Sequence, residues 1–358
     1  MTERDDAVAN RVVTWQQMYG RSHLPWQQTQ DPYRVWLSEI MLQQTQVGTV
    51  LDYYARFLER FPDIDSLAMA SQDEVLALWS GLGYYSRARN LHRCAQQIVA
   101  EHGGSFPVSA EMLATLPGIG RSTAGAIAAF CFGERTPILD ANVRRVLTRL
   151  LGFGEDLATA ANERKLWELA AALLPLMDLQ HSMPRYTQGM MDLGAMVCLP
   201  RKPLCDQCPL QSCCKAFQHD AQENYPVRSR KLSRKSESWW LLILRDPLGR
   251  VWLHRRPSSG IWAGLHCPPV FLQRKALLEW VPSAMVSGIV ELPAFLHVLT
   301  HRDLHLHPVQ LNASSVPQHS EDDGSWFERA QWQQLGLPAP VRKLLEEVAK
   351  PLMRSAEP

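Results

Sequence analysis

Apolar residues recur with helical spacing through the first 217 positions of the chain. Val143, Val146, Leu147 and Leu150 lie at i, i+3, i+4 and i+7, so a helix is predicted to begin near Asn142. Proline, glycine, aspartate and serine interrupt the pattern and mark helix ends. On the same grounds helices are predicted at residues 6–20, 32–47, 48–60, 64–69, 72–79, 87–102, 109–114, 162–175 and 184–197, with good helix formers also following residue 120.

The pattern changes after residue 237, where apolar residues occur in short runs bounded by turn residues. Residues 239–244 and 251–254 predict one β-hairpin, and residues 292–299 with 304–311 predict another. Helices are predicted near 273–280, 328–334 and 339–349. The expected fold class is therefore α + (α+β): an all-helical domain at residues 1–217, an interdomain linker at 218–237 and a smaller α+β domain at 238–358.

Composition is that of an ordinary globular protein, with 46% hydrophobic and 20% charged residues. The net charge is only +1, so any contact with nucleic acid has to be local. Residues 228–235 carry five basic side chains and no acid, a run that fits a phosphate contact or a solvated linker. No apolar run approaches the ~20 residues that span a bilayer, and the N-terminus lacks a secretory pattern. We expect a soluble, cytoplasmic protein with no membrane partner.

Two acidic residues have sequence contexts that suit catalysis. Glu39 shares the polar side of a markedly apolar helix with Gln43 and Gln46, a stripe that either faces solvent or aims a carboxylate into a cleft. Asp140 lies just before a helix N-terminus, where unpaired N–H groups and the helix dipole favour its ionised form. Aspartate is also a common N-cap, but Asn142 is itself a good cap and could leave Asp140 free to point outward.

A glycine-containing turn, Leu116-Pro-Gly-Ile-Gly120, separates two predicted helices. Gly118 and Gly120 allow backbone shapes and close approaches that other residues resist, and N–H groups at the start of the next helix favour an anion such as phosphate. The motif alone fits an ordinary interhelical turn as well as a phosphate contact.

Five of the eight cysteines fall within 17 positions. Four of them, Cys198, Cys205, Cys208 and Cys214, have the spacing C-x6-C-x2-C-x5-C, which leaves Cys213 as an adjacent spare. Four thiolates so close in sequence can hold one tetrahedral zinc ion or one iron-sulfur cluster, and spacing alone does not choose between them. A disulfide pair is disfavoured by the cytoplasmic context.

These cysteines and the Leu116–Gly120 turn resemble those of the helix-hairpin-helix DNA glycosylases of the endonuclease III superfamily. Longer strings resemble its MutY-type adenine DNA glycosylases: Leu24-Pro-Trp26, Trp36-Leu-Ser-Glu-Ile-Met-Leu-Gln-Gln-Thr-Gln46, Gly81-Leu-Gly-Tyr-Tyr85 and Met190-Met-Asp-Leu-Gly-Ala-Met-Val-Cys198. The resemblance covers nearly the whole chain, strongly over residues 11–217 and less so afterwards. It implies one 4Fe-4S cluster bound by the four cysteines of loop 198–214.

The resemblance also implies roles for individual residues. The residue matching Glu39 protonates adenine at N7, which requires a raised pKa, and the residue matching Asp140 stays ionised and stabilises the anomeric carbon. Asn142 helps to position the reacting groups. Contacts with DNA fall to Gln43, Gln44, Tyr84, Leu116, Gly118, Gly120 and Ser122, with Gln44 and Tyr84 filling or wedging the space beside the mispair.

Ser122 stands where strand-cleaving members of the superfamily have a lysine that attacks the sugar and forms a Schiff base. Serine cannot form that imine. The resemblance therefore implies a monofunctional glycosylase, which removes a base and leaves an abasic site in an intact strand.

The C-terminal half resembles the Nudix-like domain that recognises 8-oxoguanine opposite the adenine in this family. It has no run of glutamates suited to pyrophosphate hydrolysis, which favours a lesion reader over a second enzyme. Where relatives have Phe-Ser-His, this chain has Leu299, Thr300 and His301, which keep the hydroxyl and the imidazole and lack the aromatic ring.

We therefore predict a monomeric enzyme of base excision repair that removes adenine paired with 8-oxoguanine or guanine in double-stranded DNA. Replication and repair proteins are the further partners that this role suggests. Two alternatives are an endonuclease III-type glycosylase/lyase acting on oxidised pyrimidines and a non-catalytic iron-sulfur DNA-binding protein.

Overall fold

The computed structural model describes residues 3–229, 234–313 and 324–349. The chain divides into two compact units. We call the first, Met1–Tyr54, Phe61–Ala68 and Arg93–Lys231, the helical unit. The second, which we call the mixed unit, consists of Ala55–Arg60, Met69–His92 and Leu232–Pro358. Two helical segments thus group with the C-terminal residues, and the sequence-based boundary between residues 217 and 238 stays a prediction. In the basic run at 228–235, residues 230–233 lie outside the described residues.

Helices build the helical unit, as the apolar spacing predicts. They are α1 (Glu3–Tyr19), η1 (Pro25–Gln27), α2 (Pro32–Leu42), α3 (Val47–Arg60), α4 (Ile64–Met69), α6 (Tyr85–His102), α7 (Ala110–Leu113), α8 (Arg121–Phe132), α9 (Ala141–Leu151), α10 (Ala160–Ala172), α11 (Leu179–Asp192), the π-helical turn η2 (Leu193–Val197), η3 (Cys205–Gln207), η4 (Gln211–Cys213), α12 (Lys215–Gln218) and η5 (Gln222–Asn224), of which α3, α4 and α6 extend into the mixed unit.

The core of the helical unit lies between α1, α9, α10 and α11. Val12 and Trp15 of α1 are buried together with Val143 and Leu147 of α9 and with residues of α10 and α11. Gly189 lets α11 lie close to α1, because a Cβ at this position would come within 2.7 Å of Val12 Cγ1. This packing fixes α11, whose residues form one wall of the cavity described below, and α9, whose N-cap is Asp140.

One predicted helix is too long. The helix expected over residues 32–47 ends at Leu42, and α3 begins at Val47. Gln44 has a left-handed backbone with φ of 56°, which a continuing α-helix does not allow. Gln43 and Gln46 therefore do not share the helical face of Glu39 and belong to the turn between the two helices.

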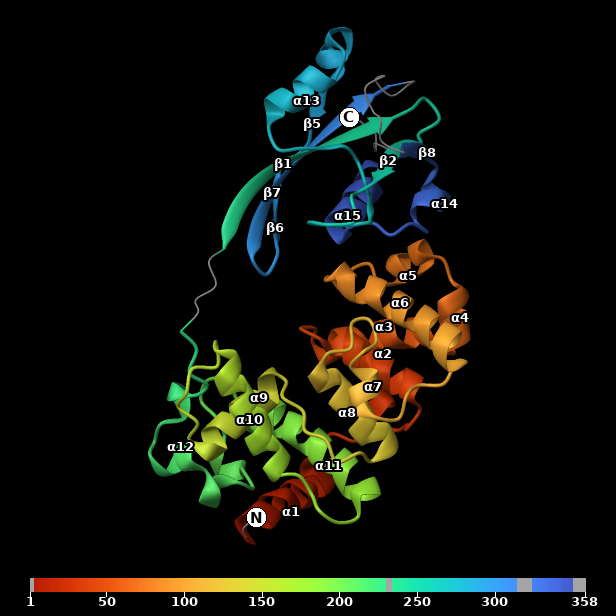
Figure 1. Cartoon of the computed structure of the whole chain (residues 1–358). Helices are drawn as coiled ribbons and strands as arrows, with labels where there is room; N and C mark the ends of the chain where they lie inside the picture. Colours follow the sequence, from red (N-terminus) through yellow and green to blue (C-terminus); the bar gives the residue numbers. More distant parts are fainter. Residues whose placement is uncertain (1–2, 230–233, 314–323, 350–358) are drawn as a thin grey trace, which may run out of the picture. The chain divides into compact units, whose positions relative to one another are not determined.

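The mixed unit contains one sheet, drawn in green to blue in Figure 1, with helices α5 (Gln72–Leu78), α13 (Arg274–Trp280), α14 (Arg329–Trp332), α15 (Ala339–Val348) and η6 (Ser283–Gly288). Its strands are β1 (Lys235–Arg245), β2 (Val251–Arg255), β3 (His266–Cys267), β4 (Val270–Phe271), β5 (Val290–Glu291), β6 (Phe295–Val298), β7 (Arg302–Asn312) and β8 (Gly324–Phe327). The strand order is β3-β2-β1-β7-β5, and β4, β6 and β8 pair with β1, β7 and β2.

Both predicted hairpins form, since β1 pairs antiparallel with β2 and β6 pairs antiparallel with β7. The longest pairing is instead parallel, between β1 and β7, from Lys235 opposite Arg302 to Arg245 opposite Asn312. With this pairing, β1 begins at Lys235, four residues before the apolar run at 239–244. The predicted fold class, a helical domain with a smaller α+β domain, is confirmed. Within the described residues, no helix has the length and apolar character needed to span a membrane.

Candidate active site and cysteine-rich loop

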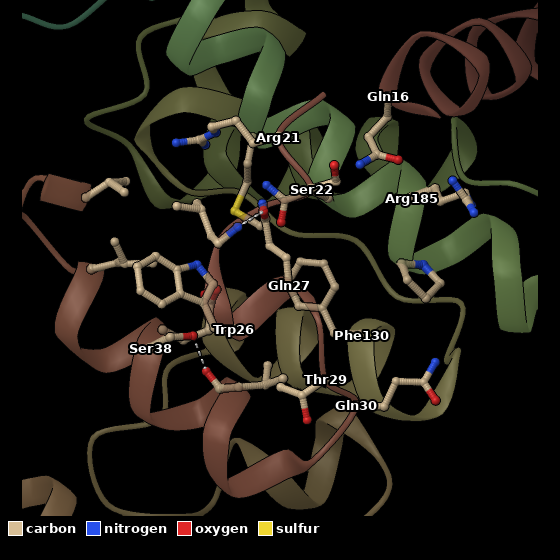
Figure 2. A pocket seen from close by; sticks show the side chains of 18 of the residues that line it. Gln16, Arg21, Ser22, Trp26, Gln27, Thr29, Gln30, Ser38, Phe130 and Arg185 are labelled. Carbon is tan, nitrogen blue, oxygen red and sulfur yellow. Dashed lines mark hydrogen bonds between the residues drawn. The ribbon is translucent and has the colours of Figure 1, made fainter. Parts of the chain in front are cut away.

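A cavity of about 360 Å³ opens in the helical unit (Figure 2). Its walls come from the end of α1, the segment that leads to α2, and the helices α2, α8 and α11. The residues that line it are Gln16, Arg21, Ser22, Leu24, Trp26, Gln27, Thr29, Gln30, Val35, Ser38, Glu39, Leu42, Val47, Phe130, Gln180, His181, Pro184, Arg185, Gln188 and Met191. Its size and mixture of aromatic, apolar and polar groups suit a small-molecule or base-sized ligand.

Glu39 contributes the only carboxylate among these lining residues. It lies on α2 next to buried Ser38 and Ile40 and is itself mostly buried. Burial, and to a smaller extent the nearby carboxylate of Asp140, raise the pKa of Glu39 to about 8. At neutral pH the group is therefore mainly protonated and able to donate a proton into the cavity.

Asp140 is the N-cap of α9, and its Oδ1 accepts a hydrogen bond of 2.7 Å from Val143 N. This corrects one expectation, because Asp140 and not Asn142 caps the helix. Burial raises the pKa of Asp140, while hydrogen bonds from the N–H groups of Val143 and Asn142 oppose the rise, as do Arg145 and Arg144. Asp140 is thus coupled electrostatically to Glu39, and burial outweighs the groups that favour its charge, so its pKa remains raised.

The glycine turn adopts the predicted form. Leu116 is buried, whereas Gly118, with φ of 78°, and Gly120 are exposed. Gly120 is the N-cap of α8, and a Cβ placed on it would meet open space. Gly120 therefore offers no capping side chain to the first N–H groups of α8, an arrangement that suits phosphate.

Helix α8 also holds the segment that leads to Asp140. Ser122 Oγ accepts a hydrogen bond of 3.0 Å from Leu139 N. Gly125 allows α8 to approach this segment, because a Cβ there would lie 2.6 Å from the Pro137 carbonyl oxygen. The turn expected to bind DNA and the aspartate expected to act in catalysis are thus parts of one packed structure.

Polar side chains on one face of α9 connect Asp140 to the cysteine-rich loop. Arg145 Nη2 donates to Asn142 Oδ1 at 2.9 Å and to the Gly194 carbonyl at 2.6 Å, and its Nε donates to the Cys198 carbonyl at 2.8 Å. Arg149, one helical turn later, donates to Cys198 Sγ at 3.3 Å and to the Leu199 carbonyl at 2.7 Å. Asn142 is therefore held by a network that reaches the first cysteine.

The cysteine-rich loop brings together the four predicted thiols. Cys198, Cys205, Cys208 and Cys214 all line one small apolar pocket. Cys213 does not, and its Sγ instead donates to the Leu210 carbonyl at 3.3 Å. Arg201, Lys202 and Lys215 are exposed around the loop, which gives it the positive surface that the sequence predicts. In the part of the chain that the structure describes, no three His, Cys, Asp or Glu side chains are set to hold a single metal ion.

The remaining predicted DNA contacts are divided between the two units. In the helical unit, Gln43 Nε2 donates to Thr123 Oγ1 at 3.4 Å, and Gln44 follows it in its left-handed conformation. Tyr84, in the mixed unit, also has a left-handed backbone, with φ of 47°, and is 40% exposed. Such strained positions in non-glycine residues are often found at functional sites.

The mixed unit places Tyr84 beside the predicted lesion-reading residues. The Tyr84 hydroxyl hydrogen-bonds to Thr300 Oγ1, and both residues line a cavity of about 530 Å³ with Leu299 and His301. Trp262 and His297 also line it and were not predicted. The positive φ of Trp262, a non-glycine residue, is visible only in the structure.

Sequence reasoning also missed a buried ion pair at the Glu39 cavity. Asp192 is fully buried and accepts hydrogen bonds from Arg21 Nε at 2.6 Å and from Gln188 Nε2 at 2.9 Å, and both donors line the cavity. An acidic residue inside the apolar string Met190-Met-Asp-Leu-Gly194 was the available signal.

Comparison with known proteins agrees with this architecture. Residues 37–172 match the HhH-GPD superfamily of base excision DNA repair proteins, and residues 239–347 match the NUDIX domain. A solved structure described as a thermostable thymine-DNA glycosylase is 27% identical, has a TM-score of 0.53, and aligns over 61% of this chain and 98% of its own.

Curated relatives cover more of the chain. The adenine DNA glycosylase of Buchnera aphidicola subsp. Baizongia pistaciae is 36% identical over 95% of this chain and 96% of its own length. The human adenine DNA glycosylase is 35% identical over 82% of this chain and 65% of its own length. Together with the geometry above, these similarities show that the chain belongs to the adenine DNA glycosylase family, in the helix-hairpin-helix superfamily of base excision DNA repair proteins.

Proposed function

We propose that this chain is a monofunctional adenine DNA glycosylase, which hydrolyses the N-glycosidic bond of adenine paired with 8-oxoguanine or guanine in duplex DNA. The observation that carries the proposal is the pair Glu39 and Asp140, two interacting carboxylates of which one faces a base-sized cavity. Their surroundings differ, as acid and anion in sugar hydrolysis require.

In the proposed mechanism the adenine leaves the base stack and enters the Glu39 cavity, at a cost of a few kcal/mol. Glu39, protonated at neutral pH, donates its proton to adenine N7. The bond between C1′ and N9 then breaks, its electron pair stays with the base, and adenine leaves as a neutral molecule. Asp140 stabilises the positive charge that develops on the sugar, and Asn142 helps to hold the reacting groups. Water adds to C1′ and gives the abasic site, and the proton that this water loses returns to the carboxylate of Glu39.

The strand is expected to remain intact after base release. The Ser122 hydroxyl oxygen accepts a hydrogen bond from Leu139 N, and the serine has no amine that could form a Schiff base with the sugar. The N–H groups after Gly120 would hold the phosphate backbone of the DNA. Gln43 and Gln44, which directly follow α2, would also contact the DNA.

The cavity of Tyr84, Leu299, Thr300 and His301 is the proposed binding site for 8-oxoguanine. Thr300 and His301 offer polar groups to the oxidised base, and Tyr84 offers an aromatic face in place of the ring that Leu299 lacks. This cavity lies within the mixed unit, which also contains the residues matched to the NUDIX domain.

The cysteine-rich loop is the proposed site of one 4Fe-4S cluster. The four thiols line one common apolar pocket, and each iron of such a cluster takes one thiolate. Cys198, Cys205, Cys208 and Cys214 would hold it. When bound, the cluster would fasten the loop and its exposed basic residues in one conformation.

Single-turnover release of adenine tests the function. The protein should release adenine from a duplex with A opposite 8-oxoguanine and not from one with A opposite T, and strand breakage should appear only after alkali. Cleavage at oxidised pyrimidines with adenine left intact would favour the glycosylase/lyase alternative. Duplex binding with no base release from any of these substrates would favour a non-catalytic iron-sulfur protein.

A further inference from the structure

The turn between α5 and α6, two helices labelled in Figure 1, has an unfavourable backbone conformation at its end. Gly81, Gly83 and Tyr84 have φ values of 108°, 68° and 47°. Glycine adopts such values without a steric penalty, whereas a side chain as large as that of tyrosine resists them. A left-handed tyrosine persists only where surrounding contacts hold it, so those contacts decide where the Tyr84 ring lies.

The side chain of Arg87, on the first turn of α6, makes several of these contacts. Its Nη2 donates hydrogen bonds to the Leu82 carbonyl at 3.0 Å and to the Gly83 carbonyl at 3.4 Å. Its guanidinium carbon lies 5.4 Å from the centre of the Tyr84 ring, which is within the range of a cation–π interaction. One guanidinium thus contacts both the backbone that precedes Tyr84 and the Tyr84 ring.

Trp79 supports the same arrangement from the end of α5. Its Nε1 donates a hydrogen bond to the Gly83 carbonyl at 3.2 Å, and the guanidinium carbon of Arg87 lies 5.5 Å from the centre of a Trp79 ring. Trp79 is fully buried and packs edge to face against Phe57, with ring centres 6.1 Å apart. The contacts of Arg87 are therefore anchored in the packed core of the mixed unit.

Burial distinguishes Arg87 from an arginine that binds the phosphate backbone of DNA. A phosphate contact requires a guanidinium at the protein surface, but Arg87 is only 8% exposed, whereas Tyr84 is 40% exposed. Burial lowers the pKa of Arg87 to about 10, so the side chain remains charged at neutral pH. A buried charge is costly unless hydrogen bonds satisfy it, which points to a role inside the protein.

We infer that Arg87 is a positioning residue that holds the Tyr84 ring in the orientation in which it meets the mispaired DNA. This inference rests on the proposed function, which gives Tyr84 a place at the mispair. Because the contacts of Arg87 exist in the free protein, the Tyr84 ring has little conformational freedom left to lose when DNA binds. Arg87 acts through Tyr84 and does not itself bind DNA.

A double-mutant cycle of Arg87→Met with Tyr84→Ala tests the inference. Arg135→Met is the matched control, since Arg135 also donates to backbone carbonyls after a helix, at the end of α10 in the helical unit. One readout is single-turnover release of adenine opposite 8-oxoguanine. The other is affinity for the same duplex, measured with Asp140→Asn present so that the base is retained. Melting temperatures establish that each variant is folded.

Arg87→Met is expected to slow base release roughly tenfold when Tyr84 is present and by less than about twofold in Tyr84→Ala, because there is then no ring to position. Tyr84→Ala alone should slow release at least as much as Arg87→Met, and Arg135→Met should slow it by less than about twofold. The slope of log affinity against log salt concentration should be the same in Arg87→Met as in the wild type, whereas losing a phosphate contact would reduce it by about one.

Arg87→Lys is a milder variant that keeps the charge, and it serves where Arg87→Met folds poorly. The compact ammonium of lysine cannot contact two carbonyls and a ring face as the planar guanidinium does, so this variant should also slow release while Tyr84 is present. Full release by Arg87→Lys, together with a reduced salt slope in Arg87→Met, would show a phosphate contact and overturn the inference.

Two further outcomes separate the inference from the proposed function. Equal losses from Arg87→Met with and without the Tyr84 ring would overturn the inference and leave the proposed function in place. Wild-type protein that released no adenine would overturn the proposed function, and the same cycle measured on duplex affinity would then decide whether Arg87 acts through Tyr84.

Discussion

Glu39 and Asp140 carry the same acidic group, yet the elements that hold them surround that group with different neighbours. On the α2 side, Glu39 has apolar neighbours, and burial and the charge of Asp140 both raise its pKa. On the α9 side, burial also raises the pKa of Asp140, but two N–H groups and two arginines oppose the rise. The comparison shows how one type of group can serve as acid on one side of a site and as anion on the other.

The two sides also differ in what supports them. Glu39 lies on a helix whose Trp36, Leu37 and Met41 are fully buried, so its position depends on apolar packing. Asp140 and Asn142 begin a helix whose Arg145 and Arg149 bind the cysteine-rich loop. We therefore expect the α2 side to tolerate changes in that loop and the α9 side to respond to them.

Replacing Glu39 by glutamine should have the largest effect. Glu39→Gln keeps the shape of the side chain and removes the proton, so single-turnover release of adenine should fall by about 10²- to 10⁴-fold. Duplex binding, measured by gel shift, should remain. A loss below tenfold would mean that the proton comes from another group.

The second largest effect is expected on the other side of the site. Asp140→Asn removes the charge that stabilises the sugar and should slow base release by about 10²- to 10³-fold. Asparagine caps helices as well as aspartate does, so the melting temperature should stay the same, whereas Asp140→Ala should also lose about 1 kcal/mol of stability with the cap. Matching kinetic and thermal losses in Asp140→Asn would contradict a catalytic role.

The pH dependence of base release and of melting temperature should report the raised pKa of Glu39. Because Glu39 acts as an acid with a pKa of about 8, base release should fall about tenfold per pH unit above that value. The pKa of folded Glu39 lies above its unfolded value, so its contribution to stability is complete below about pH 4.5 and is lost as pH rises to about 8. Wild-type protein should therefore lose melting temperature relative to Glu39→Gln as pH rises through this range. A constant difference between the two proteins would contradict the raised pKa.

Sequence reasoning could single out both carboxylates as candidates, because local signals mark their positions and the family resemblance implies their roles. The start of α9 follows from the apolar spacing around Val143, and Glu39 belongs to a long apolar segment. It could not find the break at Gln44, because nothing in the Gln-Gln-Thr string requires a left-handed residue. The contact of Tyr84 with Thr300 and the parallel pairing of β1 with β7 join residues far apart in sequence, which periodicity does not report.

Arg145 offers a test of the support on the α9 side. Arg145→Met would leave the Cys198 and Gly194 carbonyls and Asn142 Oδ1 without this donor. Each buried acceptor that loses its partner costs about 1–3 kcal/mol of folding stability. We expect lower stability and roughly tenfold slower base release. Arg144→Met is the matched control, since Arg144 binds Glu163 and not the loop. Equal effects of the two variants would show that the network does not position Asn142.

The smallest effect is expected at Ser122, which supports the α9 side through a single hydrogen bond to Leu139 N. Ser122→Ala removes the acceptor and should cost about 1 kcal/mol, or up to about fivefold in base release, and Ser122→Thr should restore most of it by keeping a hydroxyl. This hydrogen bond holds Leu139, the residue before Asp140. The fall in base release caused by Ser122→Ala should therefore be smaller when Asp140→Asn is already present, because there is then no charge to position. When Glu39→Gln is already present, Ser122→Ala should reduce base release by its full factor, because the position of α2 does not depend on the hydrogen bond between Ser122 and Leu139. A Ser122→Ala effect of equal size in both backgrounds would mean that the serine contributes only to folding, and that the α2 side and the α9 side of the site are not supported separately.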